Sequence, residues 1–342
     1  MNIEKFVRPN ILAMTPYTSL RDHAEFSKPV LLDANENPYG IYNRYPDSTQ
    51  KRLKEKLSEI KNIPADCIAL GNGSDELIDL LIKIFCIPGK DAVAVINPSF
   101  AMYSFYAEVH GSPVIKLQLD EDFQLAKEEF LSKTQHTNAK ILFLCSPNNP
   151  TGNSLENIEF FIENFDGIVV VDEAYTEFSP NISAIDYLNR YNNLVILQTL
   201  SKAWGLAGLR IGMAIASPFI ISLISKVKSP YNISSVNIQM ALMQLNSYDD
   251  YRFKLNEILT EKSRMQKKLS ELETVVKIYP SQANFFLVEF VEAGKTYEKL
   301  LEKNILTSKR FPSIPGCLRI NIGTSEENDF LIETLKNLTT EI

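Results

Sequence analysis

One lysine, Lys202, lies between two apolar runs and could act as a nucleophile. Residues 194–197 and 211–216 read as buried strands, and two glycines mark the turn between them. A lysine held at a strand end, partly out of water and near a second cation at Arg210, has a lowered pKa and more free amine, which attacks carbonyl groups. The alternative is a solvated loop lysine, which burial statistics favour for any lysine taken alone. Partners elsewhere in the chain must decide between the two.

A carboxylate, Asp172, ends the apolar run of residues 167–172. Such a run predicts a strand buried on both faces of a mostly parallel sheet, and ligands gather at the carboxyl ends of these strands. An apolar strand followed by Asp-Glu is also typical of Mg²⁺-binding ATPases. The chain, however, contains no G-x-x-x-x-G-K-[ST] phosphate loop, which excludes that interpretation.

Residues 71–76, Gly-Asn-Gly-Ser-Asp-Glu, join a predicted strand to a predicted helix at 77–85. Backbone N–H groups at the start of such a helix would suit a phosphate. The alternative is purely local: Ser74 caps the helix, and Asp75 complements the helix dipole.

Aromatic and amide side chains follow the next two predicted strands. Phe100 lies close after the strand predicted at 92–96 and could stack on a planar ligand, whereas core packing explains most of the aromatic side chains that follow it. The strand predicted at 140–146 leads into residues 147–152, a loop with two prolines and two side-chain amides, one of them Asn149. A turn alone would not need both amides.

Together these groups are what pyridoxal 5′-phosphate requires. The lysine would bond to its aldehyde carbon. Asp172 would keep the pyridine nitrogen protonated, so that the ring withdraws electrons. The phosphate would take the helix N-terminus, nearby hydroxyls and Arg210.

Composition limits the classes of partner. The chain has 342 residues, 45% of them hydrophobic, a net charge of −7 and a pI near 5.3, which argues against nucleic-acid binding. The three histidines share no ligand spacing with each other or with the four scattered cysteines, so we expect no metal site. The charged N-terminus lacks the apolar core of a signal peptide, and no apolar run reaches the length of a membrane span. These features predict a soluble cytoplasmic protein without membrane contact.

The order of the predicted elements indicates an α/β fold, with a mostly parallel mixed sheet flanked by helices and a smaller α+β domain. We expect a proline-broken N-terminal arm at residues 1–45, a large cofactor-binding domain at 46–240 and a small C-terminal domain at 241–342. The helices and strands predicted in the C-terminal domain are residues 250–273, 284–290, 295–301, 318–322 and 326–338.

Several stretches resemble the fold-type-I pyridoxal-phosphate-dependent aminotransferases, and within them the histidinol-phosphate aminotransferases, over nearly the whole chain. They are residues 32–38, 43–46, 71–76, 146–152, 171–175, 199–210 and 318–324. The resemblance implies pyridoxal 5′-phosphate as the cofactor and a homodimer. It also implies that the N-terminal arm forms part of the small domain and contacts the second subunit.

The same resemblance implies roles for individual residues. The catalytic residues would be Lys202, which bonds to the cofactor and moves a proton, Asp172, which pairs with the pyridine nitrogen, and Tyr175. The remaining cofactor-binding residues would be Gly73, Ser74, Asp75, Phe100, Asn149, Thr199, Ser201, Arg210 and, from the neighbouring subunit, Tyr45. The substrate-binding residues would be Tyr17, Asn35, Arg310 and Arg319, the last of which holds a carboxylate.

Two positions depart from the family's pattern. Phe100 stands where many relatives have tyrosine, which keeps the stacking and loses a hydroxyl. Residues 305–316 lack a clear counterpart of the second substrate-binding arginine. Lys309 or Arg310 could replace it, although Ser308 aligns most plainly.

The predicted activity is transfer of an amino group between L-histidinol phosphate and 2-oxoglutarate, in histidine biosynthesis. The alternatives within the fold are a transaminase for another amino or keto phosphate or for an aromatic amino acid, and a decarboxylase. Outside the enzymes, the alternative is a regulator that binds pyridoxal phosphate without turnover. A regulator would need the lysine but no carboxylate clamp, so Arg319 counts against it.

Overall fold

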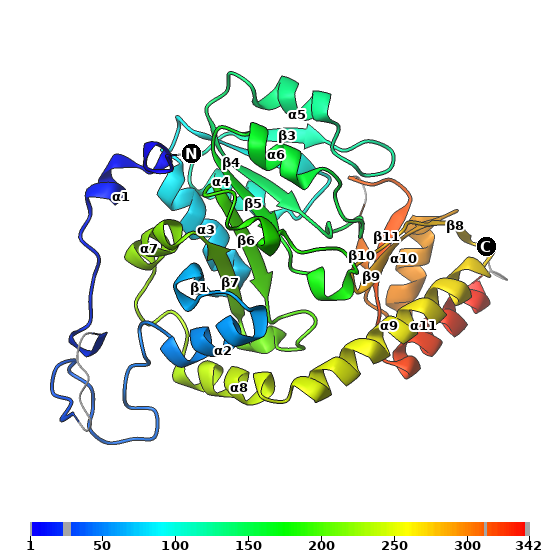
Figure 1. Cartoon of the computed structure of the whole chain (residues 1–342). Helices are drawn as coiled ribbons and strands as arrows, with labels where there is room; N and C mark the ends of the chain where they lie inside the picture. Colours follow the sequence, from blue (N-terminus) through cyan, green and yellow to red (C-terminus); the bar gives the residue numbers. More distant parts are fainter. Residues whose placement is uncertain (1, 23–28, 311–312, 339–342) are drawn as a thin grey trace.

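The computed structural model describes residues 2–22, 29–310 and 313–338, and it contains two sheets of unequal size with helices packed around them (Figure 1). The large sheet lies in the middle of the molecule and the small sheet beside it, next to the C-terminal helices (Figure 1). Among the described residues, no helix combines the length and the apolar character that a membrane crossing requires.

The large sheet has seven strands in the order β1-β7-β6-β5-β4-β2-β3. All neighbours are parallel except at β7, which runs antiparallel to both β6 and β1. The strands are β1 (Ile68–Asn72), β2 (Ala92–Asn97), β3 (Val114–Gln118), β4 (Ala139–Cys145), β5 (Ile168–Asp172), β6 (Leu194–Thr199) and β7 (Ile211–Ala216). Every residue of β5, β6 and β7 is buried, because helices and loops cover both faces of the sheet. This confirms the mostly parallel mixed sheet.

Helices surround this sheet and bring the loops at its strand ends together. They are α2 (Lys51–Lys61), α3 (Gly73–Phe85), α4 (Met102–Val109), α5 (Lys127–Thr134), α6 (Ile158–Asn164), α7 (Pro218–Val227) and α8 (Ser235–Leu245). Of these, α3 contacts β1, β4, β6 and β7, so its first turn lies close to the ends of several strands. Its buried leucines and isoleucines recur at helical spacing along the face that meets the sheet.

The C-terminal part forms the small sheet, whose four strands run in the antiparallel order β10-β11-β9-β8. Its elements are α9 (Tyr248–Ser270), β8 (Val275–Ile278), β9 (Phe285–Phe290), α10 (Ala293–Glu302), β10 (Ser308–Lys309), β11 (Cys317–Asn321) and α11 (Ser325–Leu338). A separate core joins the sheet to the three helices, with Met265, Phe286 and Leu331 among its members. The predicted elements of this region are therefore present, with bounds that differ by a few residues. The division at residue 240 stays a prediction, because the main core extends to Tyr251 and Phe285.

The N-terminal arm is more regular and better packed than its prolines predict. It contains the short helix α1 (Pro9–Ala13) and two 3₁₀ turns, at Glu4–Phe6 and Leu20–Asp22. Its first residues also pack into the main core, where Phe6 and Ile11 are buried, so this part is not a loose extension. Within one chain the arm lies on the side of the large sheet away from β8–β11, whereas the resemblance predicts that it joins the small domain (Figure 1). In this chain α1 packs against α7, and the backbone N–H of Arg8 donates to the carbonyl of Ile84 in α3 at 3.0 Å. Whether the arm belongs with the small domain stays a prediction.

Candidate active site

A cavity of about 380 Å³ opens where the carboxyl ends of β4, β5 and β6 meet the first turn of α3 and the loop before β11. Parallel strands end at one edge of the sheet, so the side chains that follow them converge there. The predicted site residues that line this cavity are Ser74, Asp75, Phe100, Asn149, Asp172, Tyr175, Thr199, Ser201, Lys202, Arg210, Arg310 and Arg319.

Asp172 is the last residue of β5 and only 3% exposed. One carboxylate oxygen, Oδ1, accepts the backbone N–H of Ala174 at 3.0 Å, and Oδ2 accepts the hydroxyl of Tyr103 at 2.6 Å. Burial raises the pKa of Asp172, and these two hydrogen bonds oppose the rise. Each oxygen keeps a further lone pair, so the carboxylate can still accept a cationic N–H donor from the cavity.

Lys202 lies in the loop after β6, and its ammonium nitrogen is 5.6 Å from the ring centre of Tyr175. Burial lowers the pKa of Lys202, the positive charge of Arg319 lowers it further, and Asp172 acts in the opposite direction. Arg210, the cation named from the sequence, has a smaller effect than Arg319. The lowered pKa makes the amine more readily deprotonated than an ordinary lysine amine, as the nucleophile interpretation requires. The residue is nevertheless exposed, as the solvated alternative expects, so the cavity around it rather than its burial favours the nucleophile.

The first turn of α3 is pressed against the start of β7. Gly73 has φ +76°, and a Cβ atom there would lie 2.5 Å from Nη2 of Arg210, so this position requires glycine. The backbone N–H of Gly73 donates to the carbonyl of Arg210 at 2.8 Å, and Nη2 of Arg210 donates to Asp75 at 3.3 Å. Gly73 thus supports the site without lining the cavity. Helix N–H groups, a guanidinium and the hydroxyls of Ser74 and Thr199 meet in an arrangement that suits a phosphate.

Two arginines on the small sheet face the same cavity. Arg319 of β11 donates to the side-chain oxygen of Asn149, and Arg310 donates to Ser308. The Nε of each arginine is buried and has no hydrogen-bond partner in the described part of the chain, where neither guanidinium pairs with an acidic side chain. Burial and the charge of Arg319 lower the pKa of Arg310. Two neighbouring cations without an acidic partner indicate a site for an anion.

The three candidate residues of the segment 305–316, Ser308, Lys309 and Arg310, point in different directions. Arg310 lines the cavity, whereas the ammonium of Lys309 lies 5.8 Å from the ring centre of Tyr297, on another face. Ser308 pairs with Arg319 across β10 and β11. Of the three candidates for the missing arginine, Arg310 is therefore the one whose position suits the role.

Three predicted residues, Tyr17, Asn35 and Tyr45, lie in the arm and do not line this cavity. Tyr17 is exposed, and Asn35 has a backbone φ of 54°. The ring of Tyr45 stacks on that of Tyr231 with 4.6 Å between their centres. The roles of all three stay predictions, and that of Tyr45 depends on a second subunit.

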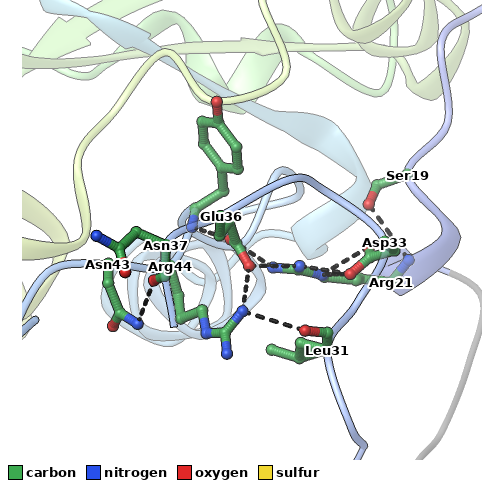
Figure 2. A network of polar contacts seen from close by, with 9 residues as sticks. Ser19, Arg21, Leu31, Asp33, Glu36, Asn37, Asn43 and Arg44 are labelled. Carbon is green, nitrogen blue, oxygen red and sulfur yellow. Dashed lines mark hydrogen bonds and ion pairs between the residues drawn. The ribbon is translucent and has the colours of Figure 1, made fainter. Parts of the chain in front are cut away.

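An ion-pair network holds the exposed part of the arm together (Figure 2). The carboxylate of Glu36 accepts hydrogen bonds from Arg21, Arg44 and the backbone N–H of Tyr45, and Arg21 also pairs with Asp33. The side chain of Glu36 is only 4% exposed, and the hydrogen bonds from Arg21 and Arg44 lower its pKa to about 2. This network connects Arg21, in the middle of the arm, to residues near its end, and nothing in their local pattern predicts it.

Sequence reasoning also missed Tyr103, which it assigned to core packing. Its ring is fully buried, as expected, but its hydroxyl reaches Asp172. The available signal was chemical: a tyrosine in a buried helix face needs a hydrogen-bond partner for its hydroxyl.

Comparisons with known proteins identify the family and the fold. The family model described as aminotransferase class I and II matches residues 22–335. The chain is 46% identical to a histidinol-phosphate aminotransferase of Parabacteroides distasonis, over 98% of this chain and 99% of that protein. The crystal structure of the histidinol-phosphate aminotransferase from Clostridium acetobutylicum superposes with a TM-score of 0.79 at 25% identity, covering 90% of this chain and 98% of that one. The enzyme of the same name from Sinorhizobium meliloti, solved in complex with pyridoxal-5′-phosphate, has a TM-score of 0.79 at 22% identity and covers 87% and 83% of the two chains.

Proposed function

The chain belongs to the class I and II aminotransferases, and on this basis we propose that it transfers an amino group between L-histidinol phosphate and 2-oxoglutarate with pyridoxal 5′-phosphate as cofactor. The observation that carries the proposal is that one cavity is lined by Asp172, by Lys202 and by two arginines that pair with no acidic side chain in the described part of the chain. The full-length similarity to the Parabacteroides enzyme supports the choice of substrate and a place in histidine biosynthesis.

The residues present fit the cofactor. Asp172 is buried, its pKa is raised, and among the described residues it accepts hydrogen bonds only from neutral donors, so a protonated ring nitrogen would supply the missing cation. The α3 N-terminus with Ser74, Thr199, Ser201 and Arg210 would hold the phosphate. Phe100 would stack on the ring, and Asn149 and Tyr175 would hydrogen-bond its oxygen. When bound, pyridoxal phosphate supplies an aldehyde carbon for the lysine amine and a ring that withdraws electrons from the substrate.

The chain's own groups account for the proton transfer. The amine of Lys202, whose pKa is lowered by burial and by Arg319, would act as the base that removes a proton from the substrate carbon bearing nitrogen, and its protonated form would deliver that proton to the cofactor's aldehyde-derived carbon. As a carboxylate, Asp172 would pair with the ring nitrogen of bound pyridoxal phosphate and would stabilise a positive charge there.

The two arginines would select the substrates. Glutamate brings an α-carboxylate, and histidinol phosphate brings a phosphate, both of which match the fork of a guanidinium. We assign the carboxylate to Arg319 and the phosphate to Arg310, with Tyr17 and Asn35 contributing from the arm. The net reaction exchanges an amino group and a hydrogen for a carbonyl oxygen between the two substrates, so it needs no external oxidant.

The proposal includes a homodimer in which Tyr45 reaches the cofactor phosphate of the second subunit. Two observations support it: Tyr45 is half-exposed, and the arm that carries it presents exposed apolar side chains at Leu32, Tyr39 and Ile41. We also propose a cytoplasmic location, supported by four buried cysteines that are all free thiols.

Covalent attachment tests the cofactor. Borohydride reduction of the purified protein should fix pyridoxal phosphate on the peptide that contains Lys202, and Lys202→Ala should abolish the labelling. Attachment to another lysine would overturn the assignment.

A panel of amino donors tests the substrate. L-histidinol phosphate should be the preferred donor to 2-oxoglutarate, ahead of histidinol and the aromatic amino acids. Arg310→Ala should raise KM for histidinol phosphate at least about tenfold and spare histidinol, because one charge-assisted bond to phosphate is lost. Lys309→Ala is the matched control, since it removes a neighbouring cation outside the cavity. Equal effects of Arg310→Ala on both amines would favour a substrate without phosphate.

A further inference from the structure

Tyr103 is held rigidly beside the carboxylate that ends β5. It lies on α4, its ring is fully buried, and it stacks on Phe143 of β4 with 4.6 Å between ring centres and 8° between planes. Phe100 meets the same ring edge-on at 5.5 Å. Packed against two aromatic neighbours, the ring cannot turn away, so the direction of its hydroxyl is set.

The hydroxyl of Tyr103 makes a short, directed hydrogen bond to the carboxylate of Asp172. It donates to Oδ2 of Asp172 at 2.6 Å, and the N–H of Ala174 donates to Oδ1 at 3.0 Å. Donors on both oxygens fix the plane of the carboxylate. A hydrogen bond of this length to a charged acceptor is among the stronger ones in proteins.

We propose that Tyr103 is a positioning residue for Asp172, holding the carboxylate ionised and aimed at the ring nitrogen of pyridoxal phosphate. The inference rests on the proposed function, because it requires that this cofactor binds.

The electrostatics agree with this direction. Burial and the charge of Asp172 raise the pKa of Tyr103, so its hydroxyl stays protonated and always acts as the donor. The hydrogen bond therefore opposes the effect of burial on Asp172. The other groups that act on Asp172 are the carboxylate of Asp75, which raises its pKa, and the ammonium of Lys202, which lowers it. Without Tyr103, the shared proton would move from the ring nitrogen towards Asp172.

Tyr103→Phe tests the proposal, since it removes one oxygen and keeps the stacked ring. Nitrogen NMR of the bound cofactor, labelled with ¹⁵N in its ring, should show the ring-nitrogen resonance of the variant moving towards that of a neutral pyridine. The affinity for pyridoxal phosphate should fall, and kcat should drop about tenfold or more. Tyr191→Phe is the matched control, because it removes a tyrosine hydroxyl from two carboxylates, Glu159 and Glu163, elsewhere on the protein.

A double-mutant cycle separates positioning from a general structural role. On an Asp172→Asn background, Tyr103→Phe should have little further effect on kcat or on the NMR resonance, because the group through which it acts is gone. An equal loss on both backgrounds, or an unmoved resonance in Tyr103→Phe itself, overturns the inference alone. A parent protein that binds no pyridoxal phosphate overturns the proposed function and this inference with it.

Discussion

Two well-covered carboxylates, Asp172 in the cavity and Glu36 in the arm, differ in the direction of their pKa shifts. Burial raises the pKa of Asp172, whereas hydrogen bonds from two guanidinium groups lower the pKa of Glu36 to about 2. Asp172 is enclosed by the apolar sheet with only neutral donors in contact, while Glu36 lies at the periphery with its cations supplied by the chain (Figure 2). We infer that Asp172, which no cation contacts in the described part of the chain, serves a ligand. Glu36, which already pairs with two cations, stabilises the fold of the arm.

The sharpest way to break this comparison is to neutralise Asp172. Asp172→Asn should retain the cofactor but slow transamination on the order of 10³-fold, because an amide cannot stabilise the charge on the ring nitrogen. Removing a buried charge should at the same time raise the melting temperature of the cofactor-free protein, since a raised carboxylate pKa means that ionisation opposes folding at neutral pH. Stopped-flow absorbance and calorimetry measure the two effects. A rate within a few-fold of the parent would show that Asp172 is structural.

Substitution of Arg319, which also lines the cavity, should have a smaller effect on activity. Arg319→Lys should lower kcat/KM for glutamate at least about tenfold, because an ammonium cannot form the bidentate fork, and should leave the affinity for pyridoxal phosphate nearly unchanged. Steady-state kinetics and cofactor titration test this. Arg264→Lys is the control, since Arg264 pairs with Glu261 on α9, outside the cavity. A parallel loss in cofactor affinity would place Arg319 with the cofactor instead.

Subunit exchange tests whether the arm serves a second cavity. Lys202→Ala and Tyr45→Phe proteins, each impaired alone, should form hybrid dimers in which one site carries neither lesion. Random exchange makes about half of the dimers hybrids, so about a quarter of all sites should be intact. Activity is measured with the cofactor limiting, before and after exchange. No gain on mixing, or an active monomer in sedimentation, would argue against shared sites.

The smallest expected effect concerns the arm network itself. The pKa of Glu36 is lowered from 4.5 to about 2, so above about pH 4.5 its ionisation stabilises the folded conformation of the arm. This contribution is lost as the pH falls towards 2. Hydrogen exchange in residues 31–46, corrected for intrinsic rates, should therefore accelerate as the pH falls from about 4.5 towards 2. Glu36→Gln should show the faster exchange already at pH 7, with activity within a few-fold of the parent. Asp33→Asn, which contacts only Arg21 of the two arginines, should change exchange less. Unchanged exchange in Glu36→Gln would mean that the network does not hold the arm.

Local pattern predicted most of the framework. Continuous apolar runs identified β4, β5 and β6, because strands buried on both faces need such runs. The helix predicted at residues 326–338 differs from α11 by one residue at its start. The helical turns near the N-terminus could not be predicted from the sequence. Helix α1 has only five residues and is stabilised by packing on α7 rather than by a periodic apolar pattern of its own.

The candidate site divides in the same way. Asp172, Lys202 and the start of α3 could be placed together from the sequence, because a parallel sheet brings the carboxyl ends of its strands to one edge. The sequence could not predict that Arg310 rather than Lys309 faces the cavity. The two residues are neighbours at the end of a two-residue strand, and their side chains point in different directions.

The sequence by itself determined the order of the elements, the chemistry available at each strand end and, through its motifs, the family. Only the tertiary structure decided which groups act on one another: Arg319 on Lys202 and Tyr103 on Asp172 across long sequence separations, and Glu36 on Arg21 and Arg44 within the arm. Propensity and periodicity act over one element, whereas the burial that shifts a pKa and the partner that opposes it come from elements packed together in the fold.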